Sequence, residues 1–297
     1  MNGILCINKP EGYTSFDVIA RLRGILRERR IGHSGTLDPM ATGVLPVFIG
    51  RATRAVDMLE NHDKTYVAEF VLGVKTDTQD RTGQVLDRRP VTAVKEEIIA
   101  AVNGFSGEIR QIPPMYSAVQ VNGKRLYDLA RRGVEIERAP RTVTIYSIRV
   151  LSVEKERCRI EVSCSKGTYI RTLCSDIGDK LGCYATLTSL QRTAASGFTL
   201  DCCHTLEEVE KYREDGSIQD RLTAVERVFS FLPKLSLSGE QTGRFLNGVK
   251  LEGNCLPIDS GHARFAVYSS GGDFLGTAVL EPETQKLKIE KLFLERK

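Results

Sequence analysis

The sequence predicts an α+β fold in which a mixed, largely antiparallel sheet is flanked by helices and followed by a small C-terminal β-barrel. Helical and β-like patterns follow one another without the regular βαβ alternation of a parallel α/β protein. The last stretch of about 65 residues carries short β-like runs separated by turn residues. The 297 residues suffice for one large and one small domain, which we place at residues 1–230 and 231–297.

The N-terminal elements are a strand and a helix. Ile4–Ile7 is a short apolar run typical of a buried strand. Apolar residues then recur at helical spacing from Val18 to Leu26, and Thr14 with Asp17 has the spacing of a capping box. The pattern predicts a helix over about residues 15–29.

A loop rich in glycine and hydroxyl residues follows, over residues 32–43. It contains three glycines and Pro39, which favour a tightly bent segment rather than a helix or a strand. Asp38 lies in this loop with His33 nearby. Such a carboxylate is a candidate reactive group, and the alternative is a turn in which Asp38 caps a neighbouring helix.

Further elements continue the mixed order. Helices are expected over residues 52–59, 94–102 (ended by Gly104), 125–132 (ended by Gly133), 169–181 (ended by Gly182), 207–212 and 222–229. Strands are expected over residues 65–74, 115–121, 142–153 and 157–164. A polar turn separates the first two strands at residues 77–83, and Asn122-Gly123 is a hairpin signal after the second.

The domain boundary is expected near Phe231-Leu232-Pro233-Lys234. Beyond it, residues 265–268, 275–280 and 287–293 are β-like runs, and Gly261, Gly271-Gly272 and Pro282 precede or separate them. Short strands with such turn signals predict the small barrel.

Composition favours a globular protein of a reducing compartment. Hydrophobic residues make up 41% and charged residues 27%, and no apolar run approaches the ~18 residues of a membrane span. The N-terminus has neither a basic leader nor a long apolar stretch, so we expect no secretory signal. With eight cysteines but no Cys-x-x-Cys pair, we expect free thiols and a cytoplasmic location.

No cofactor motif is present. The sequence lacks a G-x-x-x-x-G-K-[ST] phosphate loop, a G-x-G-x-x-G fingerprint and a His-Glu-x-x-His motif. Cys202, Cys203 and His204 are consecutive, a spacing that favours a structural role over a metal site. We therefore expect neither a metal nor a cofactor.

Basic residues are clustered although the net charge is only +4. One cluster is Arg21, Arg23, Arg27, Arg29 and Arg30, and the other is Lys124, Arg125, Arg131, Arg132, Arg138 and Arg141. Such patches suit a phosphate backbone, and the alternative for either cluster alone is a solvated helix face.

Three segments are candidates for one site. They contain Asp38 with His33, Tyr66 at the start of a strand, and Arg171 where a strand gives way to a helix. Arg171 can hold Asp38 ionised through a bidentate pair, and Tyr66 can stack on a planar base. The alternatives are a core tyrosine, a surface arginine and a histidine that satisfies a turn.

Six segments together resemble bacterial pseudouridine synthases of the TruB type. They are Asn8-Lys9-Pro10-x-Gly12-x-Thr14-Ser15, Gly32-His33-Ser34-Gly35-Thr36-Leu37-Asp38-Pro39-x-Ala41-Thr42-Gly43-x-Leu45, Lys64-x-Tyr66, Thr76-Asp77-Thr78-x-Asp80-x-x-Gly83, Pro113-Pro114-x-Tyr116-Ser117-Ala118 and Cys164-Ser165-Lys166-Gly167-Thr168-Tyr169-Ile170-Arg171. They occur in order over roughly residues 3–200, which is far more specific than one motif. The tail resembles a PUA domain, a small RNA-binding β-barrel, more weakly.

The resemblance implies the pseudouridine synthase fold and a cofactor-free reaction. The family converts uridine 55 in the T loop of tRNA to pseudouridine, after flipping the base out. Asp38 then matches the essential aspartate, Tyr66 the tyrosine stacked on the target base, and Arg171 the arginine paired with the aspartate. By the same resemblance, residues that contact or frame the flipped nucleotide are His33, Tyr169 and Leu190. The implied partner is the T stem-loop of tRNA, with no membrane and no obligate protein partner, and we expect a monomer.

Elementary chemistry agrees with this assignment. A carboxylate is a nucleophile toward sugar carbons, and an unperturbed aspartate, with a pKa of about 3.9, is ionised at neutral pH. Stacking on an aromatic ring, at ~1–3 kcal/mol per base, offsets much of the cost of extruding a base. Two rivals remain, a non-enzymatic RNA-binding protein and a nucleoside hydrolase, although no second paired carboxylate supports the hydrolase.

Overall fold

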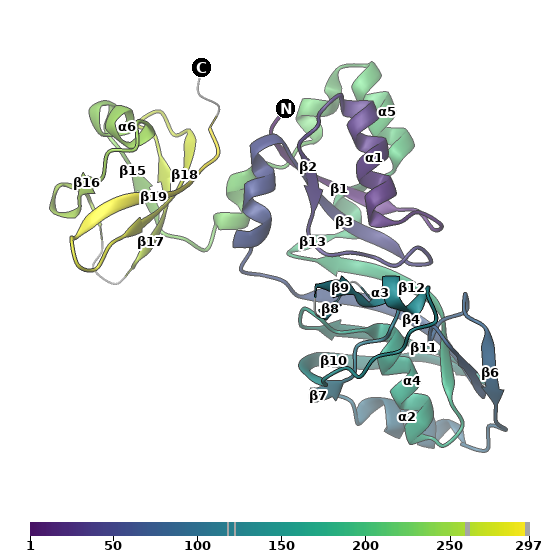
Figure 1. Cartoon of the computed structure of the whole chain (residues 1–297). Coiled ribbons are helices and arrows are strands. Elements are labelled where there is room, and N and C mark those ends of the chain that lie inside the picture. The colour runs from purple at the N-terminus through teal and green to yellow at the C-terminus, as the bar shows by residue number, and fades with distance from the viewer. Residues whose placement is uncertain (118, 122, 259–261, 295–297) are drawn as a thin grey trace.

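The structure is a computed structural model that describes residues 1–117, 119–121, 123–258 and 262–294, apart from the side chain of Arg125. Ala118, Asn122 and Gly261, which the sequence analysis used, lie outside the described residues. Within the described part, a ten-stranded mixed sheet runs through two adjoining bodies, and a five-stranded sheet forms a third body beside them (Figure 1).

The large sheet confirms the mixed, largely antiparallel architecture. Its order is β14-β1-β3-β12-β4-β11-β10-β7, with β2 paired to β3 and β13 to β12. The strands are β1 (Gly3–Lys9), β2 (Ile31–His33), β3 (Thr42–Ile49), β4 (Lys64–Leu72), β7 (Gly107–Gln111), β10 (Arg141–Glu154), β11 (Arg157–Cys164), β12 (Ala185–Ala195), β13 (Phe198–Thr199) and β14 (Cys203–His204). Among the described strands of this sheet, parallel pairing is confined to β1 with β14 and β3 with β12.

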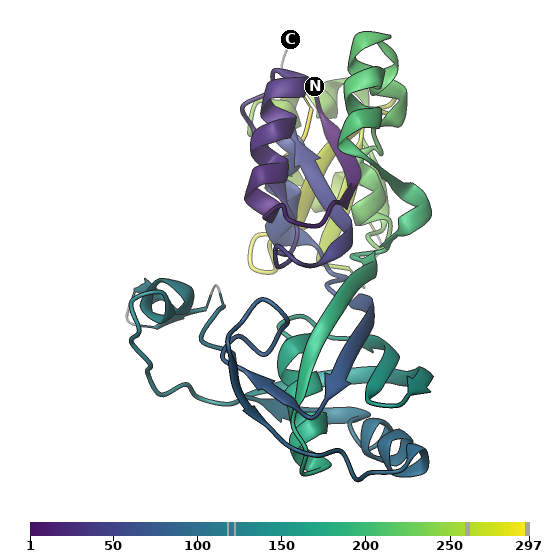
Figure 2. The same ribbon diagram turned by 90° about the vertical axis from the view of Figure 1, so that its right-hand side faces the viewer.

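Strand β12 joins the two halves of this sheet. It pairs antiparallel with β4 along most of its length, and parallel with β3 only at Gln191 and Arg192. Figure 2 shows it as the long teal-green strand that rises from the lower body toward the upper one. The strand that leaves the residue 34–41 loop, β3, therefore meets β4 through β12 at the centre of the molecule.

Helix α1 (Ser15–Leu26) has the predicted capping box. The Asp17 amide donates to Thr14 Oγ1 at 3.0 Å, and the Thr14 amide donates to Asp17 Oδ2 at 2.8 Å. The helix ends before the predicted residue 29 because Arg27 adopts a left-handed conformation with φ 52°.

Three of the other helices pack on the two halves of the large sheet, namely α2 (Lys95–Asn103), α4 (Ile170–Lys180) and α5 (Leu206–Glu214). Helix α6 (Gly239–Leu246) packs on the C-terminal sheet, and the remaining described helix is α3 (Leu126–Ala130). The 3₁₀ segments are η1 (Gly50–Met58), η2 (Leu200–Cys202), η3 (Ser217–Arg221), η4 (Val225–Phe229) and η5 (Gly253–Cys255). One core lies between α2, α4 and the β4–β11 half, and another between α1, α5 and the β1–β3 half.

Three local predictions need adjustment. Of the predicted helix 52–59, residues 52–58 are helical as part of the 3₁₀ segment η1, and Leu59 lies just beyond it. In the stretch 222–229, Thr223 exchanges two backbone hydrogen bonds with Ile4 at 2.8 Å, so only Val225–Phe229 coils, again as 3₁₀. Of the described residues between 115 and 121, only β8 (Gln120–Val121) is a strand; it pairs with β9 (Lys124–Arg125) across the predicted hairpin turn.

The correction at residues 115–117 has a clear cause. The Tyr116 carbonyl accepts a hydrogen bond from Arg171, and the Ser117 carbonyl accepts one from the Tyr127 amide. Backbone groups engaged in this way are not available to a strand ladder. A second small hairpin, β5 (Val74–Thr76) with β6 (Val85–Arg88), flanks the polar turn predicted at residues 77–83.

The C-terminal sheet has the order β15-β17-β18-β19-β16 and forms a half-barrel. Its strands are β15 (Lys234–Ser236), β16 (Leu251–Glu252), β17 (Arg264–Tyr268), β18 (Phe274–Leu280) and β19 (Lys286–Leu292), which confirm the three β-like runs. This sheet begins just after the predicted boundary. Its Ala266 and the following Phe293 share a hydrophobic core with residues of β1 and β3 in the large sheet. The division into domains at residue 230 stays a prediction.

None of the described helices combines the length and the apolar character that a membrane crossing needs. All eight cysteines are free.

Candidate active site

The described residues enclose a cavity of about 620 Å³ at the junction of the two halves of the large sheet. Three segments far apart in the sequence line it, namely the residue 34–38 loop, the start of β4, and the turn that leads into α4. These are the three segments that the sequence analysis proposed for one site. The volume lies in the range of small-molecule and cofactor pockets.

The loop that carries Asp38 is bent and well tied. Gly35 has φ +84°, a conformation that glycine adopts without strain. The Leu37 amide donates to Ser15 Oγ at 2.9 Å, and the Ala41 amide donates to the Asp38 carbonyl at 3.0 Å. These bonds aim Asp38 at the cavity, where its side chain is 36% exposed.

Arg171 binds Asp38 in a bidentate pair. Its Nε lies 2.9 Å from Asp38 Oδ2, and its Nη2 lies 3.3 Å from Asp38 Oδ1. The guanidinium also donates to the carbonyls of Thr78 and Tyr116, at 3.2 and 2.8 Å. With only 5% of its side chain exposed, Arg171 is held in one orientation and cannot act as a surface arginine.

Asp80 is the site residue that the sequence analysis missed as an individual group. Its Oδ2 lies 3.6 Å from Arg171 Nη1, while its Oδ1 accepts from Thr78 Oγ1 and from both the amide and the hydroxyl of Thr82. The carboxylate is buried, so Arg171 bridges two acids. The Thr76–Gly83 motif held the signal, because an aspartate among threonines is typical of a self-bonded turn.

Tyr66 and Leu190 form apolar walls of the cavity. They lie on β4 and β12, and their side chains are 6% and 7% exposed. Burial raises the pKa of the Tyr66 hydroxyl, and the neighbouring Arg192 opposes the rise. The hydroxyl is thus neutral, and the buried ring both belongs to the hydrophobic core, as in the alternative of a core tyrosine, and lines the cavity.

Tyr169 also lines the cavity, at the N-terminal end of α4. Its amide donates to Gln111 Oε1 at 3.0 Å, and its carbonyl accepts from Gln111 Nε2 at 3.2 Å. Gln111 is 1% exposed, so a buried amide fixes the turn that carries both Tyr169 and Arg171.

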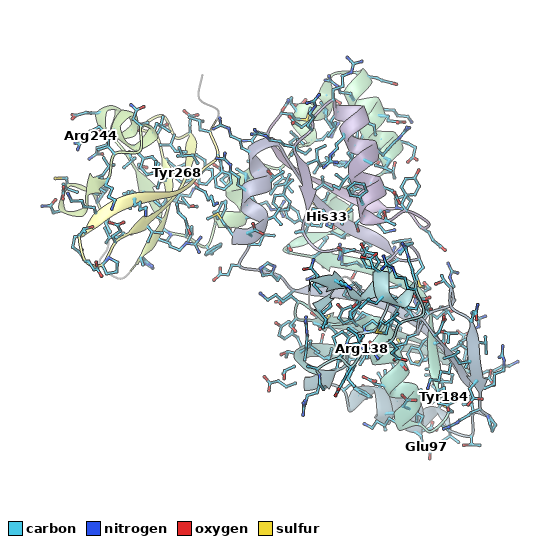
Figure 3. The ribbon with its side chains drawn as sticks, in the orientation of Figure 1. His33, Glu97, Arg138, Tyr184, Arg244 and Tyr268 are labelled. Atoms are coloured by element: carbon cyan, nitrogen blue, oxygen red, sulfur yellow. The ribbon has the colours of Figure 1, made fainter. Side chains whose placement is uncertain are left out.

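His33 is a predicted site residue that does not line the cavity among the described residues. It ends β2, opposite Val47, in the body that contains α1 (Figure 3). Its Nδ1 is buried and has no hydrogen-bond partner in the part of the chain that the structure describes, and burial lowers the pKa of the imidazole. A neutral histidine here contacts the base of the loop, and its substrate role stays a prediction.

Lys9 is a fully buried cation beneath the loop. Its Nζ donates to the carbonyls of Pro10, Tyr13 and Pro39, the last at 3.3 Å. Burial lowers the pKa of Lys9 to about 8, while Asp38 acts in the opposite direction.

The electrostatic state of Asp38 follows from these neighbours. Burial raises the pKa of the Asp38 carboxyl, and Arg171 opposes this; Asp80 raises it further and Lys9 lowers it. Among the described residues, no cluster of three His, Cys, Asp or Glu side chains could hold a metal ion. The chemistry available is that of a carboxylate and a fixed guanidinium beside an aromatic wall.

The chain is similar to known proteins over its whole length. Residues 23–170 match the family model "TruB family pseudouridylate synthase (N terminal domain)", and residues 171–230 match "tRNA pseudouridylate synthase B C-terminal domain". The curated tRNA pseudouridine synthase B of Alkaliphilus oremlandii is 45% identical over 303 residues and covers 100% of both chains. That of Clostridium kluyveri is 42% identical and covers 99% of this chain and 100% of its own.

Two solved structures have the same fold. "Crystal Structure of a Cbf5-Nop10-Gar1 Complex" aligns with TM-score 0.73 and 28% identity over 99% of this chain and 85% of the other. "Structure of H/ACA RNP bound to a substrate RNA containing 2'-deoxyuridine" aligns with TM-score 0.72 and 26% identity over 99% and 86%. The chain therefore belongs to the TruB family of tRNA pseudouridine synthases.

Proposed function

We propose that this enzyme converts uridine 55 in the T loop of tRNA to pseudouridine, without a cofactor, and that Asp38 is its essential carboxylate. The observation that carries the proposal is the Asp38–Arg171 pair at a cavity walled by Tyr66 and Leu190. The curated relatives named tRNA pseudouridine synthase B, which align over the whole chain, support the tRNA substrate.

In this reaction the bond between C1′ and N1 breaks and a bond between C1′ and C5 forms. The C5 hydrogen leaves as a proton and N1 gains one, so no oxidant or reductant is needed. Asp38 supplies the negative charge that a cationic C1′ requires, or the base that removes a proton. Arg171 keeps the carboxylate ionised despite its burial and fixes its direction.

The target base must leave its stack to reach Asp38. Extrusion costs a few kcal/mol, and stacking on Tyr66 offsets ~1–3 kcal/mol of it. A cavity of about 620 Å³ leaves room for a uracil to turn while the apolar side chain of Leu190 keeps it from escaping. Retention of the detached base separates an isomerase from a hydrolase.

The surroundings of the cavity suit a polyanion. Lys64, Lys166 and His62 line it together, and burial with the nearby lysines lowers the pKa of His62. One solved relative is described as bound to a substrate RNA. We propose that residues 1–230 are the catalytic domain, that the half-barrel of residues 231–297 is PUA-like and adds RNA affinity, and that the protein acts as a cytoplasmic monomer.

Release of tritium from a T stem-loop RNA labelled at C5 of uridine tests the proposal. The wild type should release it, whereas Asp38→Asn should release none while its Kd for the RNA stays near that of the wild type. Arg171→Ala should lose most of the rate without unfolding. Substantial turnover by Asp38→Asn would refute the assignment of Asp38. Binding without tritium release by the wild type would indicate an RNA-binding protein, and free uracil in the product would indicate a hydrolase.

A further inference from the structure

Arg192 is a fully buried cation without an acidic partner. Its side chain is 0% exposed, and it forms no salt bridge with any residue that the structure describes. A buried charge is unfavourable unless it is compensated by hydrogen bonds. Arg192 lies outside the cavity lining, so the proposed chemistry leaves it unused.

Its compensation comes from the segment that carries Asp38. Nη2 donates to the Gly35 carbonyl at 3.1 Å, Nη1 reaches the Thr36 carbonyl at 3.5 Å, and Nε donates to the Val44 carbonyl at 2.8 Å. The first two groups begin the loop, and the third lies on β3 just after it. One planar guanidinium therefore ties the two ends of the loop together.

The backbone of Arg192 holds the same place. It pairs with Gly43 of β3 on one side and with Tyr66 of β4 on the other. A Cβ on Gly43 would lie 2.2 Å from the Arg192 carbonyl oxygen, so the two strands touch here. Arg192 thus occupies the point where the Asp38 loop, the Tyr66 strand and β12 meet.

We propose that Arg192 is a positioning residue for the isomerisation, which sets the place of Asp38 relative to Arg171 and Tyr66 through the carbonyls of Gly35 and Thr36. This inference rests on the proposed function. The positive charge of Arg192 also acts on the surrounding groups, since it contributes to the lowered pKa of both Lys64 and His33. Arg192 acts on the reaction through the loop and makes no contact with substrate.

The test separates positioning from folding. Arg192→Met keeps the length of the side chain and removes its donors, whereas Arg192→Lys keeps the charge with fewer directed donors. Ile98→Ala is the matched control, because Ile98 is 1% exposed on α2 and its loss destabilises the fold away from the loop. For each folded variant, the single-turnover rate of tritium release at saturating protein and the Kd for the T stem-loop RNA are measured.

Arg192→Met should lower the single-turnover rate by about 100-fold, because a displacement of about 1 Å costs this much in a positioned site. Its Kd should stay within about threefold, and Arg192→Lys should recover part of the rate. Ile98→Ala should keep the wild-type rate at temperatures where it is folded. If Arg192→Met fails to fold, Arg192→Lys carries the test, and a rate at least about tenfold below the control is required.

The inference is overturned if the folded Arg192 variants turn over as fast as Ile98→Ala, or if rate and affinity fall by the same factor. A wild type that releases no tritium defeats the proposed function instead, so the two failures are distinguishable.

Discussion

Arg171 bridges two carboxylates, so removing the charge of Asp80 and removing the charge of Arg171 should shift the pKa of Asp38 in opposite directions. Asp80→Asn removes a negative charge 3.6 Å from Arg171 Nη1 while it keeps the shape of the side chain. Because Asp80 raises the pKa of the Asp38 carboxyl, its removal should lower that pKa. Arg171→Gln removes the cation that opposes the rise, so the pKa of Asp38 should increase.

The structure also sets the size of the stability effect of Asp80→Asn. At 3.6 Å and an effective dielectric constant of about 20, the attraction between Arg171 and Asp80 is at most roughly 4–5 kcal/mol. The three hydrogen bonds to Oδ1 persist in a neutral, weaker form, and the repulsion from Asp38 disappears. We therefore expect a loss of roughly 2–3 kcal/mol in the free energy of unfolding, below the ~3–5 kcal/mol of a buried pair broken outright.

Tritium release under single-turnover conditions, measured as a function of pH, tests the sign. Asp38 must be ionised to act, so the rate falls as pH decreases through its pKa, and the acid limb of the wild type lies above the ordinary value of 3.8. Asp80→Asn should move the limb to lower pH, although a misplaced Arg171 lowers the plateau. Arg171→Gln should move it to higher pH. Limbs that stay in place, or that move in the same direction in both variants, would falsify the electrostatic account.

Substitutions at Tyr66, Gly43 and Thr14, with Tyr66→Phe and Gly24→Ala as controls, test the walls and the supports of the site. Tyr66→Ala removes ~1–3 kcal/mol of stacking free energy and should therefore lower kcat/KM roughly 5–150-fold, while Tyr66→Phe keeps the ring and most of the rate. Gly43→Ala, at φ +101° and against the Arg192 carbonyl, should cost at least ~2 kcal/mol in urea unfolding; Gly24→Ala, in open space on α1, should instead stabilise by ~0.5–1 kcal/mol. Thr14→Ala should cost ~1 kcal/mol through the lost cap and leave the rate of tritium release unchanged.

The elements that the sequence predicted well are those whose signals are local. The capping box at Thr14 and the strand pattern of residues 157–164 were confirmed because each reports a backbone preference or a single buried face. Two of the three segments that line the cavity, residues 34–38 and 166–171, stood out in the sequence because each combines glycine and hydroxyl residues with a charged side chain, and the role of the cavity stays a prediction.

The elements that the sequence analysis missed depend on distant partners. Strand β12 is central and almost entirely paired, yet its run of small and polar residues has no clear alternation. The order of β12 between β3 and β4 decides which loops meet, and no single-strand pattern contains that order. For the same reason Asp80 and Arg192 looked like ordinary polar residues, since only the assembled sheet shows what their side chains bind.

The charges around the site explain why a half-buried carboxylate can remain reactive. Three buried cations, Lys9, Arg171 and Arg192, face two carboxylates, Asp38 and Asp80, which leaves a net charge of +1 (3 − 2). Only Arg171 pairs with the acids, whereas the other two cations bind loop carbonyls and so place the loop while they add positive potential. If Lys9 or Arg192 bound an acid instead of the loop carbonyls, the loop would lose that support. If Asp80 were removed, Arg171 could turn away from its fixed direction. The positive charge in excess therefore lies on Lys9 and Arg192, which hold the loop backbone, and not on Asp38. For this reason Asp38, paired with Arg171, can stay ionised when a polyanionic substrate is bound.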